Sequence, residues 1–173
     1  CLLRGVLSPA LGPTLRQLVM GTSTIGSVDL PPITYLSMDP LSSTVGASQV
    51  LPYVERFADR GVDVELLTFE HVVDQAVRER LAGVGVVWRP QRYGRHGPAG
   101  GLGRVLRAAR AVRGSSVVHA RSDMAAASVM LAGLDCWVWD VRSLWADQKV
   151  ATGVMRDGSP QERLMRWVER QAA

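Results

Sequence analysis

The chain contains few cysteines, a single lysine and no asparagine. Its two cysteines, Cys1 and Cys136, are too few for a disulfide framework or a zinc site. The chain has nineteen arginines but only one lysine, Lys149. This bias is typical of a GC-rich coding sequence, because lysine and asparagine codons are rich in adenine. We therefore do not interpret the abundance of arginine, or the net charge of +4, as a sign of nucleic-acid binding.

Several functional motifs are also missing. The sequence has no His-Glu-x-x-His, no Cys-x-x-Cys and no Gly-x-Ser-x-Gly, so a catalytic metal is unsupported. It has neither the Gly-x-Gly-x-x-Gly dinucleotide fingerprint nor a P-loop. No apolar run approaches the roughly 20 residues that a membrane-spanning helix needs.

Length and composition are those of one globular domain, with 173 residues, 47% of them hydrophobic and 21% charged. Residues 1–31 differ, because glycine and proline interrupt their leucine-rich pieces. They lack the unbroken apolar stretch of about 7–15 residues that a secretory signal carries. We interpret residues 1–31 as a poorly ordered leader or upstream sequence, residues 32–173 as the domain, and the protein as cytoplasmic.

Short β-branched runs alternate with helical patterns along the chain. The sequence predicts strands at 33–38, 62–69, 84–88, 117–120 and 137–141. It predicts helices at 47–60, 71–82, 102–113 and 123–133, and a last one from about 160 to the end. Several strands are almost continuously apolar, as in a parallel sheet covered on both faces. The fold class is therefore α/β, a Rossmann-like, doubly wound and mainly parallel sheet flanked by helices.

Polar residues follow each predicted strand. Ligands of open parallel sheets bind outside the carboxyl ends of the strands, so we expect the functional edge there. The segments concerned are 39–49, 70–71, 89 onward, 121–123 and 142–147.

The first of these loops contains Gly46, followed by Ser48 and Gln49 at the start of a predicted helix. Glycine lets the backbone approach a ligand, and a helix N-terminus offers N–H groups to a phosphate or a sugar hydroxyl. Alternatively, Gly46 only permits the turn and Ser48 only caps the helix.

His119 and Arg121 alternate along the fourth predicted strand, so their side chains point to the same face of the sheet. They suit a polar or anionic group. The alternative is a core histidine with Arg121 paired to Asp123. Asp140 and Arg142 also share a face, either in a site or as a structural ion pair. Trp145, just beyond them, can stack on a sugar ring or simply fill the loop.

Residues 89–113 contain seven arginines and no acid. On a helical wheel, four arginines occupy one half of the predicted helix and apolar residues the other: Arg104, Arg107, Arg110 and Arg113. The pattern is typical of a packed helix with a solvated basic face. The alternative is docking on an anionic membrane surface, which would make the protein peripheral at the inner face of the membrane. Nucleic acid is disfavoured, because aromatic residues are sparse there.

Three blocks in order resemble the N-terminal domain of family-4 glycosyltransferases of the GT-B type. The blocks are Tyr35–Tyr53, then Val118–Ser122, then Trp139–Asp147 followed by the helix with Arg163–Arg170. The resemblance covers about residues 33–173 and implies that a sugar is transferred from a nucleotide-sugar donor to a glycan, lipid or small-molecule acceptor, as in polysaccharide biosynthesis. It further implies retention at the anomeric carbon and no metal or other cofactor.

The same resemblance assigns roles to individual residues. It implies that Gly46, with Ser48 and Gln49, approaches the donor phosphate. His119 and Arg121 take the catalytic positions, although many relatives have two glycines at Val45-Gly46 and some have a histidine at Arg121. The residues implied for the acceptor cleft are Glu70, Ser122, Arg142, Trp145 and Asp147.

The resemblance also implies a partner. A donor-binding C-terminal domain is expected to follow residue 173, and without it the chain is expected to be inactive. The alternative is a stand-alone module that binds a glycan or lipid head group, or a membrane surface, without turnover.

Overall fold

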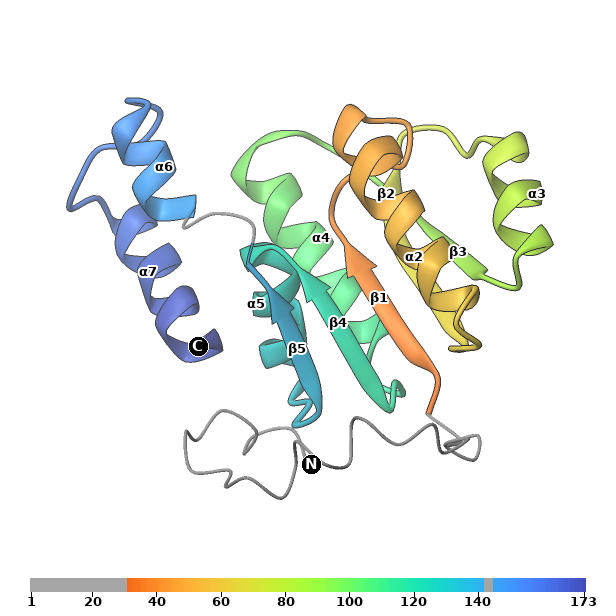
Figure 1. The fold of residues 1–173 in the computed structure, drawn as a ribbon. Helices are drawn as coiled ribbons and strands as arrows, with labels where there is room; N and C mark the ends of the chain where they lie inside the picture. The colour runs from red at the N-terminus through yellow and green to blue at the C-terminus, as the bar shows by residue number, and fades with distance from the viewer. Residues whose placement is uncertain (1–30, 142–144) are drawn as a thin grey trace, which may run out of the picture. The chain divides into compact units, whose positions relative to one another are not determined.

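The structure, a computed structural model, describes residues 31–141 and 145–173. Five strands alternate with helices in this part of the chain (Figure 1). The elements are β1 (Ile33–Ser37), the π-helical turn η1 (Gly46–Val50), α2 (Leu51–Ala58), β2 (Val64–Glu70), α3 (Gln75–Gly83), β3 (Val87–Arg92), α4 (Gly97–Ala111), β4 (Val117–Arg121), α5 (Asp123–Ala132), β5 (Trp137–Asp140), α6 (Trp145–Ala151) and α7 (Pro160–Ala172). All strands are parallel, in the order β3-β2-β1-β4-β5. The predicted Rossmann-like α/β fold is therefore confirmed.

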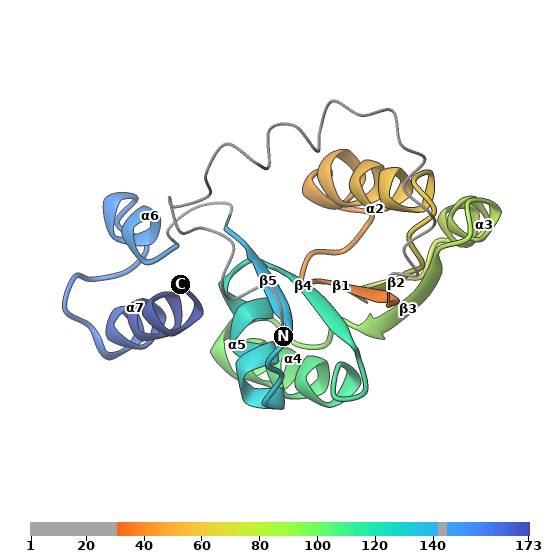
Figure 2. The ribbon, with the colours of Figure 1, turned by 60° about the horizontal axis from the view of Figure 1, so that its bottom comes forward.

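Helices cover both faces of the sheet, α2 and α3 on one side and α4 and α5 on the other (Figure 2). Successive side chains of β1 pack into the cores on opposite faces of the sheet, because side chains alternate along a strand. Tyr35 is fully buried with Val54 of α2, whereas Leu36 is fully buried with Val129 of α5. The last helix, α7, contacts α5.

Several helix ends follow signals that are visible in the sequence. The Asp74 carboxylate accepts a hydrogen bond from the amide of Ala76 at 2.8 Å and so caps α3. Ser159 caps α7 in the same way, through the amide of Glu162 at 3.2 Å. Gly61 adopts a positive φ of 76° just after α2, as expected of a glycine that ends a helix.

Four elements differ clearly from the prediction. The helix α3 begins at Gln75 rather than at 71, because Asp74 is its N-cap. The third strand begins at Val87 rather than at 84, because the intervening residues turn the chain after α3 with Gly85 at φ 80°. It also continues through Pro90 to Arg92, which is possible because β3 is an edge strand. The helix α4 begins at Gly97 rather than at 102, within a glycine-rich segment that looks like a loop. The helix α6 was not predicted.

Two glycines of α4 form a matched pair for a stability test. A Cβ added at Gly100 would lie 1.8 Å from the carbonyl oxygen of Arg95, whereas one added at Gly103 would have no heavy atom within 4 Å. We expect Gly100→Ala to lower the free energy of unfolding by about 1–3 kcal/mol, because backbone must move. We expect Gly103→Ala to raise it by up to about 1 kcal/mol, since alanine favours the helix. Urea unfolding measures both, and a stabilising Gly100→Ala would contradict the packing described.

Candidate functional site

The strand order reverses at β1, which lies between β2 and β4. The connection after β1 enters η1 and α2 on one face of the sheet, and the connection after β4 enters α5 on the other. In open parallel sheets, ligands bind at such a switch point, at the carboxyl ends of the strands. Polar residues meet there across long stretches of sequence.

A chain of polar contacts joins three elements at this edge. The guanidinium of Arg121, at the end of β4, donates a hydrogen bond through Nη2 to Oε1 of Gln49 in η1 at 2.5 Å. Its Nη1 lies 3.7 Å from Oδ2 of Asp140, the last residue of β5. The same carboxylate oxygen lies 3.5 Å from Nε2 of His119. Arg121 is only 2% exposed, so its charge is enclosed by these neighbours.

His119 lies among aromatic rings. It stacks on Tyr35 of β1, with ring centroids 4.7 Å apart and planes at 23°. The rings of Tyr53 and Phe57 in α2 meet it edge-on, at 5.5 and 6.1 Å. The rings fix the imidazole next to a carboxylate, an arrangement that can hold and move a proton.

The backbone is strained next to Arg121. Ser122 has φ 79° and ψ 168°, a combination that is almost confined to glycine. No other non-glycine residue in the described part of the chain has a positive φ. The Ser122 amide donates to the carbonyl oxygen of Asp140 at 3.2 Å, which ties the strained peptide to β5. Strain of this kind clusters at functional sites.

The glycine loop is packed against its own chain. A Cβ at Gly46 would lie 2.1 Å from the carbonyl oxygen of Pro40, so glycine is required there. The Gly46 amide already donates to Oγ of Ser43 at 3.0 Å, and the Ser48 hydroxyl donates to the Thr44 carbonyl at 2.6 Å. The alternative that Ser48 caps this helix was wrong, because the N-cap residue of η1 is Val45 and no side chain caps it. The role of this loop in phosphate binding stays a prediction.

Asp123 lies next to the strained serine and begins α5. It is 5% exposed, and its Oδ2 has no hydrogen-bond partner in residues 31–141 and 145–173. Burial, and secondarily the charge of Glu169 in α7, raises the pKa of this carboxyl from 3.8 to about 6. Arg121 thus pairs with Asp140 and not with Asp123, which corrects one of the two interpretations of that arginine.

Glu70 is buried at the end of β2 and holds the loop after β1. Its carboxylate accepts hydrogen bonds from the amide of Leu41 at 3.0 and 3.1 Å and from Oγ1 of Thr68 at 2.6 Å. The structure therefore places Glu70 in a supporting position, with the strand β1 between it and Arg121.

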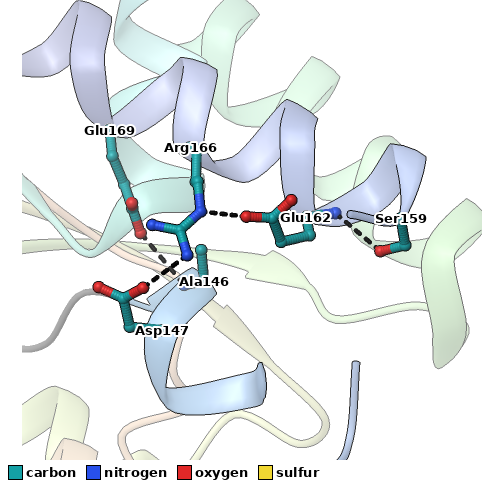
Figure 3. Close-up of polar contacts among 6 residues, drawn as sticks. All are labelled: Ala146, Asp147, Ser159, Glu162, Arg166 and Glu169. Carbon is teal, nitrogen blue, oxygen red and sulfur yellow. Dashed lines mark hydrogen bonds and ion pairs between the residues drawn. The ribbon is translucent and has the colours of Figure 1, made fainter. Parts of the chain in front are cut away.

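The remaining predicted cleft residues lie in or before α6. Arg142 lies outside the described residues, as does the side chain of Trp145. Figure 3 shows Asp147, whose carboxylate pairs with Nη2 of Arg166 in α7 at 2.7 Å. Arg166 also pairs with Glu162, and Glu169 accepts a hydrogen bond from the amide of Ala146 at 3.2 Å. These contacts fasten α6 to α7, so Asp147 has a structural partner.

Of the four arginines predicted on a solvated face, Arg110 and Arg113 are exposed, but Arg104 is buried, so the prediction was wrong for Arg104. Arg104 is 7% exposed, whereas Leu106 is 42% exposed. The Arg104 guanidinium lies 4.1 Å from the centre of the Tyr93 ring and donates to the carbonyl oxygen of Arg95 at 3.2 Å. The neighbouring loop supplies a ring and carbonyl groups, so an arginine is buried where the wheel predicts a polar surface.

Sequence reasoning missed the contributions of Asp123 and Asp140. Asp140 was paired with Arg142, but in the register of β4 and β5 its partner is Arg121. Nothing in the sequence indicates that α7 covers Asp123 with a second carboxylate.

No family model, curated protein or solved structure matches the chain. Within the described residues, no cluster of three or more histidine, cysteine, aspartate or glutamate side chains could hold a metal. In that same part, no helix is both long and apolar enough to cross a membrane.

The raised pKa of Asp123 predicts a pH-dependent stability. A carboxyl whose folded pKa exceeds its unfolded value of 3.8 stabilises the fold below that value, and the contribution is lost as pH rises through about 6. We expect Asp123→Asn to be more stable than the wild type at pH 7.5, by up to about 3 kcal/mol. Near pH 4 the two should be alike. Urea unfolding at both pH values measures the free energy of unfolding, with Asp135→Asn as the exposed control. An equal gain in stability for Asp123→Asn at the two pH values would contradict the prediction.

The strain at Ser122 predicts different stabilities for two substitutions at this position. Glycine adopts the observed backbone angles freely, so we expect Ser122→Gly to raise the free energy of unfolding by about 0.5–2 kcal/mol. Ser122→Ala keeps the strain and removes a hydroxyl that makes no cap, so it should gain nothing. Thermal unfolding compares the two variants. Equal stabilities would show that the peptide at position 122 is relaxed.

Proposed function

We propose that the chain is the acceptor-side half of a retaining GT-B glycosyltransferase of family 4. The observation that carries the proposal is the contact chain from Gln49 through Arg121 and Asp140 to His119, at the switch point of a parallel sheet. In the three-block resemblance, the loop that approaches the donor and the strand end that meets the acceptor are the segments that these contacts join.

His119 is the catalytic residue of the proposal. Its imidazole lies 3.5 Å from the Asp140 carboxylate, a pair that can orient an acceptor hydroxyl and share its proton. Arg121 takes a different role from the one implied by the resemblance. Because its guanidinium is enclosed by Gln49 and Asp140, it positions these groups rather than touching the sugar.

The other parts of the proposal concern partners. The donor is a nucleotide-sugar, bound largely by a second α/β domain that works with this one. The acceptor carries a hydroxyl and meets the edge formed by η1, β4 and β5. A cytoplasmic location, with or without contact to the inner face of the membrane, suits a nucleotide-sugar donor.

The test is turnover of radiolabelled nucleotide-sugars by the chain together with the second α/β domain that the proposal requires. We expect His119→Ala to lower kcat/KM by about 10²–10⁴-fold, the usual contribution of a general acid–base. Arg121→Lys keeps a buried positive charge, and we expect it to lower kcat and shift the pH dependence of the rate. Arg60→Gln, an exposed arginine beyond α2, serves as the control. Circular dichroism verifies that each variant is folded.

Three outcomes decide between the candidate functions. Turnover that is lost in His119→Ala and kept in Arg60→Gln supports the transferase. Binding of a glycan or head group without turnover supports the stand-alone module. Full turnover by His119→Ala would contradict the assignment of the site.

A further inference from the structure

A second polar site lies at the carboxyl ends of β2 and β3. A cavity of about 540 Å³ is lined by Glu70, His71, Arg92, Gly94, Arg95 and Arg107. Because β1 separates β2 from β4, this cavity is distinct from the contacts around Arg121. The proposed glycosyl transfer does not use it.

The lining of the cavity is strongly basic. It includes three guanidinium groups and one imidazole, against the single carboxylate of Glu70. That carboxylate already accepts hydrogen bonds from the amide of Leu41 and the hydroxyl of Thr68. The net charge that faces the cavity is therefore positive, as a bound anion requires.

Two arginines of α4 fix the backbone that forms the rim. Arg107 donates through Nη2 to the carbonyl oxygens of Arg92 and Tyr93, at 3.0 and 3.4 Å. Arg104 donates through Nη1 to the carbonyl of Arg95 at 3.2 Å. The turn itself uses Gly94, at φ 79°. The backbone of the rim is thus held in place by Arg104 and Arg107, and Arg107 also lines the cavity.

The guanidinium N–H groups of Arg92 and Arg95, at the rim, are available to a ligand. The Arg92 and Arg95 side chains are exposed and make no ion pair or hydrogen bond within the described ranges, 31–141 and 145–173. In the same part of the chain, Nε of Arg107 is buried without a hydrogen-bond partner. That nitrogen is enclosed by protein, with the Arg107 guanidinium 5.7 Å from the centre of the Phe69 ring, so the exposed Arg92 and Arg95 are the groups available to a ligand.

Aromatic rings pack against His71, one of the residues that line the cavity. His71 lies 4.2 Å from Tyr93 and 5.5 Å from His96, measured between ring centroids. A volume of about 540 Å³ is enough for a small molecule. Guanidinium groups bind phosphate in a bidentate manner, which favours phosphate over a monovalent spherical anion.

We propose that this cavity binds a phosphate group, with Arg92 and Arg95 as its direct ligands, while Arg107 and Arg104 hold the backbone of the rim through the carbonyls of Arg92 and Arg95. The phosphate can belong to a soluble phosphomonoester or to a lipid head group. The chemistry at the guanidinium groups is the same in both cases.

The test measures binding with two probes. Calorimetry follows inorganic phosphate at constant ionic strength, with chloride as the reference anion. Flotation follows phosphatidylcholine vesicles with and without phosphatidylglycerol. We expect the double variant R92Q/R95Q to weaken phosphate binding by about tenfold or more, because two charge-assisted contacts are lost. The matched control R56Q/R60Q removes the same charge from exposed arginines of α2 and the turn after it.

Loss of binding in R92Q/R95Q but not in R56Q/R60Q supports the proposal, and the probe that responds identifies the source of the phosphate. Equal loss in the two double variants would show a general effect of charge and overturn it. Absence of binding in both arms would overturn it as well. None of these results bears on sugar transfer, which is measured by turnover of variants at His119.

Discussion

The enclosed guanidinium of Arg121 is the constraint on which the carboxyl edge of the sheet depends. A charge with 2% exposure is tolerated only if its neighbours compensate for lost water. Gln49 and Asp140 provide that compensation, so η1, β4 and β5 are held together by one side chain. Removing it would take a positive charge away from the Asp140 carboxylate, which is only 16% exposed, and should be more damaging than the loss of a surface ion pair. The position of His119 depends on the same pair, because its partner is the shared carboxylate.

Most of the fold could be predicted from the sequence, because the periodicity of apolar residues reports local structure directly. All five strands exist in the described part, and Val50 and Val54 face the core as expected. The failures occur where composition is misleading. The strand β3 contains Pro90 and arginines, which an edge position tolerates, and α4 starts in a glycine-rich segment whose close approach to Arg95 needs glycine. Both are properties of the neighbours and not of the segment itself.

In the candidate site, too, the local geometry could be predicted from the sequence, whereas the contacts with other elements could not. The alternation of His119 and Arg121 places both on the face that α2 covers, as the strand geometry requires. Their partners depend on the register between strands, which single residues do not reveal: Asp140 comes from β5 and Gln49 from seventy-two residues upstream. A helical wheel also fails for α4, because it ignores the Tyr93 ring that makes a buried position favourable for Arg104. Arginine in this chain often serves as a clamp on carbonyl groups, as Arg104 and Arg107 do.

The proline in β3 has a consequence for association between molecules. An edge strand exposes unpaired backbone groups that invite another chain to add a strand and extend the sheet. Proline inside a sheet is confined to positions where its missing N–H would have faced outward. Pro90 therefore deprives an incoming strand of a donor in the middle of β3. The outer margin of the sheet next to the basic cavity is protected in this way from edge-to-edge aggregation, while the cavity stays open to small ligands.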